Sequence, residues 1–251
     1  MRNSELVSIV TANYNSEKYI KQLYDSLLSQ KYVNWEWLVI DDCSNDASPL
    51  MITAFMASDS RVKLFRNDKN KGPAHSRNKG IRKAKGRYVT FIDSDDFWED
   101  DFLSESISIM EKNKYFLVFS SYKRFIEEED RYMSPFIVPD KVDYKELLKT
   151  CSISCLTAVY DAGHFGLRQM PEIAKRQDYG FWLNLLKDVD YAYGIKRTLA
   201  TYRIRKSSVS RNKVKAMYYV WVLFRKVEKI NFFKSLYYFI VYSVNGYLKY
   251  R

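Results

Sequence analysis

An apolar run that ends abruptly in carboxylates restricts the folds available to this chain. Residues 88–92 (YVTFI) are apolar, aromatic or β-branched, and Asp93, Asp95 and Asp96 follow within four positions. Such a run, without polar alternation, is typical of a buried strand in a parallel sheet. Carboxylates at the C-terminal end of that strand lie in the crevice where open α/β sheets bind ligands.

These three carboxylates have two interpretations. Close anions repel one another unless a cation or hydrogen-bond donors lie among them. A hard divalent ion that shares its oxygen ligands with a phosphate meets that need. The alternative is an acidic loop that caps the next helix, since Asp96 and Glu99 suit a first turn. The stretch alone leaves both interpretations open.

The chain before this stretch alternates predicted strands and helices. Apolar runs predict strands at residues 6–11, 35–42 and 62–66, and helical spacing or a proline near a helix start predicts a helix after each. This alternation indicates right-handed crossovers and a parallel sheet, so the expected class is α/β. Because parallel strands end at one edge, Tyr14 and Asp42 are expected to converge there with the three carboxylates.

The second half of the chain is less regular. An acidic run at residues 127–130 predicts the solvated tip of a hairpin. Predicted strands cover residues 115–122, 153–160, 191–195 and 199–203, and predicted helices cover 101–112, 143–149 and a segment that starts near Gln177.

Cysteine usage and the N-terminus indicate a compartment. Cys43, Cys151 and Cys155 are odd in number and lack the spacing of metal ligands, which favours a reducing compartment. Residues 1–5 form a short polar lead into the first predicted strand rather than a signal peptide. We therefore expect a cytoplasmic protein.

The net charge of +11 is concentrated at the C-terminus. Residues 196–251 hold 14 Lys/Arg and one acid, Glu228, whereas residues 1–195 hold 27 Lys/Arg and 29 Asp/Glu. A basic end indicates an anionic partner, either a membrane surface or a nucleic acid.

Residues 211–251 predict a helical extension rich in basic and aromatic residues. Its most apolar part, residues 235–244, is too short to span a bilayer. Cationic amphipathic helices with aromatic residues suit a membrane interface, and the alternative is packing onto the rest of the chain or a twin subunit. Two apolar stripes recur at helical spacing, Met217, Val220, Trp221, Phe224 and Val227, then Phe233, Leu236, Tyr237, Ile240, Val241 and Val244.

Four ordered motifs resemble those of one enzyme family. No Gly-x-Gly-x-x-Gly follows the first predicted strand, and no Walker-type loop is present. The segments 7–15 (VSIVTANYN), 38–46 (LVIDDCSND), 70–80 (NKGPAHSRNKG) and 91–98 (FIDSDDFW) instead resemble, in family order, glycosyltransferase family 2, the inverting enzymes of GT-A fold.

The resemblance implies a domain organisation. Residues 1–210 would form a GT-A catalytic domain, a Rossmann-like and mostly parallel sheet flanked by helices. Within it, residues 1–103 would bind the nucleotide-sugar and residues 104–210 the acceptor. Residues 211–251 would form the amphipathic helical extension.

The resemblance also implies roles for single residues. Tyr14 and Asp42 would contact the uracil of a UDP-sugar, and Asp93 its ribose. Asp95 would ligate a Mn²⁺ or Mg²⁺ ion that bridges the diphosphate. Arg77 would support the nucleotide or the carboxylates. The implied nucleotide-sugar site is completed by Ala12, Lys71, Ser94 and Arg205.

The expected chemistry requires these residue types. Breaking the sugar–phosphate bond leaves an anionic diphosphate, which a divalent cation stabilises as charge develops. A carboxylate on the opposite face can take the proton of the acceptor hydroxyl, and one displacement then inverts the anomeric centre. The resemblance gives this role to Asp178, although Gln177 stands where the family usually has Glu. Arg205 stands where many relatives have a histidine ligand, and its planar guanidinium suits a diphosphate.

We therefore predict a metal-dependent inverting glycosyltransferase of bacterial surface-polysaccharide (O-antigen or capsule) synthesis. It would move a hexose or N-acetylhexosamine from a UDP-sugar to a lipid-linked oligosaccharide, on the inner face of the cell membrane. Alternatively, the C-terminal helices would contact a second subunit in a homodimer. A rival enzyme, a sugar-nucleotidyltransferase, would carry a Gly-rich, Arg-containing loop unlike residues 13–15. A basic nucleic-acid-binding protein would spread its charge over the fold, and residues 1–195 are slightly acidic.

Overall fold

A mixed ten-stranded sheet forms the centre of the computed structural model, which describes residues 3–205 and 213–249. The strand order is β3-β2-β1-β4-β9-β6-β10-β5, with β7 paired to β6 and β8 to β10. The strands are β1 (Asn3–Asn13), β2 (Trp35–Asp41), β3 (Val62–Arg66), β4 (Gly86–Phe91), β5 (Phe97–Trp98), β6 (Leu117–Ile126), β7 (Arg131–Phe136), β8 (Lys141–Val142), β9 (Ala158–Asp161) and β10 (Ala192–Ile204).

Helices follow most strands of the first half and end the chain. They are α1 (Ile20–Leu28), α2 (Ser48–Ser58), α3 (Pro73–Lys83), α4 (Phe102–Asn113), α5 (Tyr144–Lys149), α6 (Ala162–Phe165), α7 (Gln177–Leu185), α8 (Lys213–Val222) and α9 (Phe232–Lys249). Short turns of 3-10 helix are η1 (Glu127–Glu129) and η2 (Cys155–Thr157), and η4 (Leu223–Val227) is π-helical.

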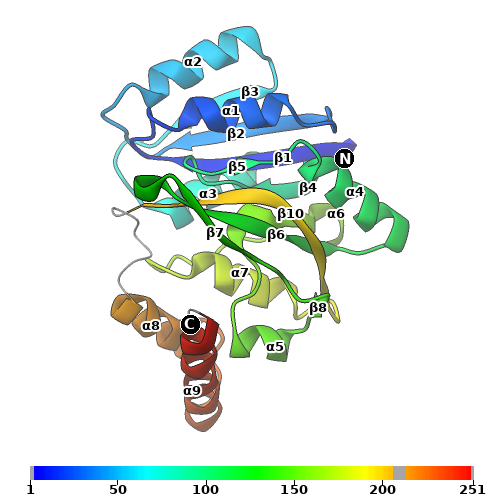
Figure 1. Ribbon diagram of the computed structural model, residues 1–251, viewed down its shortest axis with the longest axis vertical. Helices are drawn as coiled ribbons and strands as arrows, with labels where there is room; N and C mark the ends of the chain where they lie inside the picture. The colour runs from blue at the N-terminus through cyan, green and yellow to red at the C-terminus, as the bar shows by residue number, and fades with distance from the viewer. Residues whose placement is uncertain (1–2, 206–212, 250–251) are drawn as a thin grey trace.

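The strand pairing confirms the expected α/β class. β1 pairs in parallel with β2 and β4, and β2 pairs in parallel with β3. β10 is parallel to β6, while β9 runs antiparallel between β4 and β6. The C-terminal ends of β1, β2, β4, β6 and β10 therefore lie on one side of the sheet, at the left of Figure 1. We call this side the carboxyl edge.

Each face of the sheet carries its own apolar core. Leu23 of α1 and Phe102 of α4 are fully buried on one face, and Ile81 of α3 is fully buried on the other. Helix α3 packs tightly on β1, because a Cβ atom at Gly80 would lie 2.4 Å from Val10 Cγ1. A side chain there would push α3 outward, so glycine allows this helix to sit tightly behind the carboxyl edge.

Two predictions of strand extent were wrong. The strand predicted at residues 153–160 begins only at Ala158, because η2 occupies the residues before it. The strands predicted at 191–195 and 199–203 are one strand, β10, whose pairing with β6 shifts register at its middle. Residues 196–197 are exposed lysine and arginine, and these charges interrupt the apolar pattern although the backbone stays extended.

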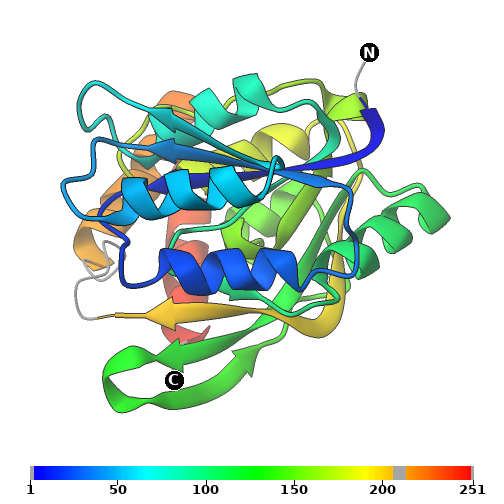
Figure 2. The same cartoon turned by 90° about the horizontal axis from the view of Figure 1, so that it is seen from above.

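The acidic run at residues 127–130 forms the tip of the β6–β7 hairpin, as predicted, but its first residue is not solvated. The Glu127 carboxylate accepts a hydrogen bond from the Tyr19 hydroxyl at 2.8 Å and pairs with Lys18 at 2.9 Å. Figure 2 shows this hairpin beside β10. The contacts tie the hairpin tip to the segment that follows β1.

The C-terminal extension consists of α8, η4 and α9 in the described residues, which confirms the predicted helices. Figures 1 and 2 show them on the opposite side of the sheet from α1 and α2. Leu223, Phe224 and Tyr242 are buried in the core beneath the sheet, so one face of the extension packs onto the rest of the chain. The boundary predicted at residues 210–211 lies outside the described residues. Over residues 3–205 and 213–249, no helix is both long and apolar enough to cross a bilayer.

Candidate active site

The loop after β4 carries the first predicted carboxylate, Asp93, into contact with helix α3. The Asp93 side chain is partly exposed and pairs with the guanidinium of Arg77 at 2.5 Å. Burial lowers the pKa of Arg77, but the negative charges of Asp93 and Asp178, among others, outweigh it and hold this pKa above its ordinary value. Arg77 is thus a fixed cation that neutralises acids from two different segments.

Asp95 and Asp96 lie deeper in the same loop. Burial, followed by the charge of Asp93, raises the pKa of Asp95, and burial with the charges of Asp95 and Asp93 raises that of Asp96 well above its usual range. Arg205 pairs with Asp95, and one Asp96 oxygen accepts the backbone N–H of Arg203 at 2.8 Å. Crowded acids of this kind are stabilised by cations among them, and Arg77 and Arg205 supply two.

Arg203 organises this loop, and sequence reasoning missed it. Its Nε donates to the backbone carbonyl of Asp95 at 2.9 Å, and its Nη2 donates to Gln22 Oε1 at 2.5 Å. The guanidinium also lies 5.0 Å from the ring centroid of Tyr19 and 3.7 Å from Glu127. The Tyr-Arg-x-Arg pattern at residues 202–205, at the end of a predicted strand, could have indicated it. The sequence analysis gave a role to Arg205 and none to Arg203, the other arginine of the pattern.

Antiparallel pairing brings Arg203 to the loop. Ala200 and Thr201 of β10 pair with Trp98 and Phe97 of β5, the short strand directly after the acids. Both sides of this contact are therefore fixed by the sheet, so the arrangement of the acids depends on backbone pairing as well as on charge.

The loops after β1 and β2 form the other half of the site. Tyr14 is exposed, whereas Asp42 is buried. The Asp42 carboxylate accepts the backbone N–H groups of Lys71 and Gly72 at 2.9 and 2.7 Å and the amide of Asn67 at 2.8 Å. Asp42 therefore holds the loop before α3 in place, in addition to any contact with a base. Asn67 follows β3, so the residue after a third strand end joins the same edge, as the alternation of strands and helices predicts.

Asp178 lies in the first turn of α7, where the helix dipole favours a carboxylate. Its neighbours Tyr179, Phe181 and Trp182 are fully buried, which fixes the helix under the sheet. The Asp178 charge helps to raise the pKa of both Arg77 and the buried Cys155 thiol, so Asp178 lies near the Arg77–Asp93 pair.

All predicted site residues thus lie at the carboxyl edge. Ala12 and Ser94, both half-buried, follow or end the strands β1 and β4. The donors and acceptors converge from five segments that are far apart in the sequence, residues 12–14, 42, 71–77, 93–95 and 178, with Arg205 closing the site from β10.

The acids suit a divalent metal that is held mainly by its substrate. Across the described residues, no three His, Cys, Asp or Glu side chains come together as a complete metal site. Asp95 nevertheless offers a crowded carboxylate at the edge of the sheet, and Mg²⁺ typically takes one or two carboxylates together with substrate phosphates. The donor set therefore fits Mn²⁺ or Mg²⁺ bound with a diphosphate.

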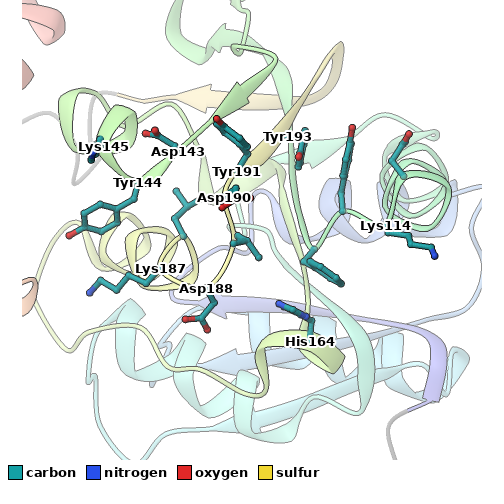
Figure 3. Close-up of a pocket in the computed structure, with 15 residues that line it drawn as sticks. Lys114, Asp143, Tyr144, Lys145, His164, Lys187, Asp188, Asp190, Tyr191 and Tyr193 are labelled. Carbon is teal, nitrogen blue, oxygen red and sulfur yellow. The ribbon is translucent and has the colours of Figure 1, made fainter.

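A hollow of about 680 Å³ lies away from these acids. Figure 3 shows Tyr191, Tyr193 and Lys114 on one side of it and Tyr144 and Lys187 on another. These residues flank the starts of β6 and β10 or the end of α7, so the hollow is on the side of the sheet opposite the carboxyl edge. It contains none of the predicted site residues.

Comparisons with known proteins show the family to which the chain belongs. The model of "Glycosyl transferase family 2" matches residues 8–170. A putative teichuronic acid biosynthesis glycosyltransferase, TuaG of Bacillus subtilis, is 36% identical over 96% of this chain and 96% of that protein. The UDP-Glc:alpha-D-GlcNAc-diphosphoundecaprenol beta-1,3-glucosyltransferase WfgD of Escherichia coli is 39% identical over 96% of this chain and 93% of that protein.

Solved structures share the fold at lower sequence identity. TarS 1–349 of S. aureus, in complex with UDP-GlcNAc, has a TM-score of 0.70 and 22% identity, covering 88% of this chain and 66% of that one. A mannosyltransferase of Pyrobaculum calidifontis, PcManGT, in complex with GDP-Man and Mn²⁺, has a TM-score of 0.65 and 16% identity, covering 90% and 65%. The chain thus spans about two thirds of these solved chains, and their likeness establishes the GT-A fold.

Proposed function

The chain belongs to glycosyltransferase family 2, and we propose that it moves a hexose or N-acetylhexosamine from a UDP-sugar to a hydroxyl of a lipid-linked oligosaccharide. The observation that carries this proposal is the clustering of acids with arginines after β4, where Asp93 pairs with Arg77, whose charge also acts on Asp178, and Asp95 pairs with Arg205. Single-displacement transfer requires one acid on the diphosphate side of the sugar and another on the acceptor side, and the proposal gives these roles to Asp95 and Asp178.

The proposed donor is a UDP-sugar. The E. coli relative is named for UDP-Glc, and the TarS structure holds UDP-GlcNAc. The exposed ring of Tyr14 offers a surface on which a uracil can stack, beside the loop that Asp42 fixes. In this proposal Ala12, Lys71 and Ser94 line the nucleotide and Asp93 contacts the ribose.

The proposed metal site is Asp95, which would hold Mn²⁺ or Mg²⁺ together with phosphate oxygens. When bound, the ion neutralises the charge that develops on the leaving diphosphate. Arg205 pairs with Asp95, and in this proposal its planar guanidinium also binds the diphosphate. Arg203 keeps the acidic loop in position through the Asp95 carbonyl and the Asp96 carboxylate.

The proposed base is Asp178, which takes the proton of the acceptor hydroxyl while the sugar–phosphate bond breaks. The oxygen of that hydroxyl forms the new bond at the anomeric carbon, and the diphosphate leaves from the other face. Arg77 is a positioning residue in this proposal, since it pairs with Asp93 and its charge also acts on Asp178.

The proposed acceptor is attached to a polyprenyl-type lipid on the inner face of the cell membrane. The name of the WfgD relative specifies a diphosphoundecaprenol acceptor, and that of TuaG specifies teichuronic acid biosynthesis. These names support a role in surface-polysaccharide synthesis and a peripheral membrane location for this chain. The enzyme family leaves no ground for the nucleotidyltransferase or nucleic-acid-binding alternatives.

Calorimetric titration of UDP tests the donor site. We expect wild-type protein to bind UDP more tightly with Mn²⁺ than without it, and Asp95→Asn to lose this dependence on the metal. Asp100→Asn is the matched control, because Asp100 lies in the same segment, is exposed and pairs with Lys31 instead. The proposed site would be contradicted if the UDP affinity of the wild type did not depend on Mn²⁺, or if Asp95→Asn kept the metal dependence of the wild type.

A further inference from the structure

The outward face of α9 is apolar and exposed. Its large side chains are between 39% and 81% exposed, and Phe233 is the most exposed of them. They recur three or four positions apart and so lie on one side of the helix, while Ser235 and Tyr242 on the other side are buried. We call this face the outer stripe, and it consists of Phe232, Phe233, Leu236, Tyr237, Ile240 and Val244.

Lysines surround the start of this stripe. Lys226, Lys229 and Lys234 are exposed around the turn that joins η4 to α9. In the part of the chain that the structure describes, none of the three forms an ion pair with an acid. Exposed apolar residues of this extent mark an interaction surface, and the lysines specify an anionic one.

The single acid of the extension is withdrawn from this surface. The Glu228 side chain is almost fully buried, pairs with Lys187 at 2.7 Å and accepts a hydrogen bond from the Tyr144 hydroxyl at 2.6 Å. Figure 3 shows Tyr144 and Lys187 on the same side of the hollow. The outward surface of the extension is therefore cationic and apolar, with its negative charge turned inward.

We propose that the outer stripe and its three lysines dock on the surface of an anionic lipid bilayer. Apolar and aromatic side chains of an interfacial helix enter the boundary between headgroups and acyl chains, while cationic residues contact anionic headgroups. A second copy of the chain fits less well, because a two-fold contact through this stripe brings the same lysines toward each other. The inference deepens the proposed function and rests on it, because the proposed lipid-linked acceptor makes a membrane the expected partner.

The position of the stripe suits an acceptor held in the membrane. Helix α8 begins at Lys213, eight residues after Arg205 at the active site. A chain of that length spans at most about 30 Å when fully extended. The start of α8 therefore lies within that distance of Arg205, and α9 packs on α8 through Trp221 and Phe239. A bilayer bound to the stripe is held on the same molecule as the site, which brings a lipid-linked sugar toward it.

Sedimentation with vesicles tests the docking surface. Full-length protein is incubated with vesicles of phosphatidylcholine alone or mixed with phosphatidylglycerol. We expect binding to the anionic vesicles, weaker binding in high salt, and a loss of roughly tenfold or more in the partition coefficient for the double variant Phe233→Ser/Ile240→Ser. Leu50→Ser is the matched control, because Leu50 is equally exposed but lies on α2, on the other side of the sheet.

A second variant separates charge from apolar contact. Lys226→Gln/Lys229→Gln/Lys234→Gln is expected to lower binding to the anionic vesicles and leave the weak binding to phosphatidylcholine unchanged. The inference is overturned if wild type ignores both kinds of vesicle, or if the Phe233→Ser/Ile240→Ser variant binds as wild type does. A concentration-dependent dimer that this variant abolishes, without vesicle binding, overturns it in favour of a second copy.

Titration of UDP into the same variants keeps this test separate from the proposed function. Unchanged UDP binding with lost vesicle binding assigns the defect to the outer stripe alone. Vesicle binding by a wild-type protein that does not bind UDP leaves the docking surface intact and removes the proposed donor site.

Discussion

The carboxyl edge and the outer stripe differ in whether their charged side chains have ion-pair partners within the protein. At the carboxyl edge three ion pairs join charged groups within the protein, Arg77 with Asp93, Arg205 with Asp95 and Lys18 with Glu127. On the extension the one acid is buried and the exposed lysines face outward. The ion pairs at the carboxyl edge fix side chains for a small ligand, whereas the exposed lysines and apolar side chains of the extension form a surface that a large partner can cover.

The two faces of the extension give the largest expected contrast. Phe224 is fully buried against Tyr179 and Tyr238, so Phe224→Ala should lower the free energy of unfolding by about 3–5 kcal/mol. Phe233→Ala, on the outer stripe, should change it by less than about 0.5 kcal/mol. Urea denaturation of both variants measures the difference. Equal losses would mean that the outer stripe is part of the folded core.

Arg203 should affect turnover by holding the loop that carries Asp93, Asp95 and Asp96, without contacting the substrate itself. Arg203→Met removes the donors to the Asp95 carbonyl and to Gln22, and we expect turnover to fall about 100-fold through misplacement of Asp95. The apparent affinity for Mn²⁺ should weaken in the same variant, which a loss of stability alone does not produce. A variant that keeps wild-type metal dependence and turnover would remove Arg203 from this role.

The hairpin tip should respond to pH, with a smaller effect. Burial raises the pKa of Glu127, but hydrogen bonds from Lys18 and Tyr19 outweigh it and hold that pKa below its ordinary value. Such a carboxylate binds fewer protons when folded, so its contribution is present above the unfolded pKa and is lost as the pH falls through the folded one. Glu127→Gln should cost about 1 kcal/mol at pH 7 and less in acid. A cost that is the same at both pH values would contradict the pairing.

The sequence predicted the carboxyl edge well because local patterns determine it. Apolar runs ending in Asp42 and Asp93 define buried parallel strands, and parallel strands must end together. The pairing of Arg203 with the loop after β4 was not predictable in this way, because it joins residues more than a hundred positions apart through β5, which has two residues. The continuity of β10 was missed because exposed charges at residues 196–197 resemble those of a loop.

The C-terminal extension could likewise be predicted only in part from the sequence. Helical spacing identified both apolar stripes, but spacing cannot tell which of two apolar faces is covered. The structure buries Val220 and Phe224 of the first stripe and exposes Phe233, Ile240 and Val244 of the second. Only the tertiary contacts of Glu228 and Tyr242 show which way the extension is turned.

The account depends most on Asp178 as the base of an inverting transfer. The decisive measurement is sugar transfer by Asp178→Asn, followed beside UDP binding, with UDP-Glc or UDP-GlcNAc as donor and a GlcNAc-diphosphate-lipid as acceptor. We predict that UDP binding stays within about twofold of wild type while turnover falls by about 1,000-fold or more, and that wild type gives a β-linked product. Wild-type turnover in Asp178→Asn, or an α-linked product from an α-linked donor, would contradict the account.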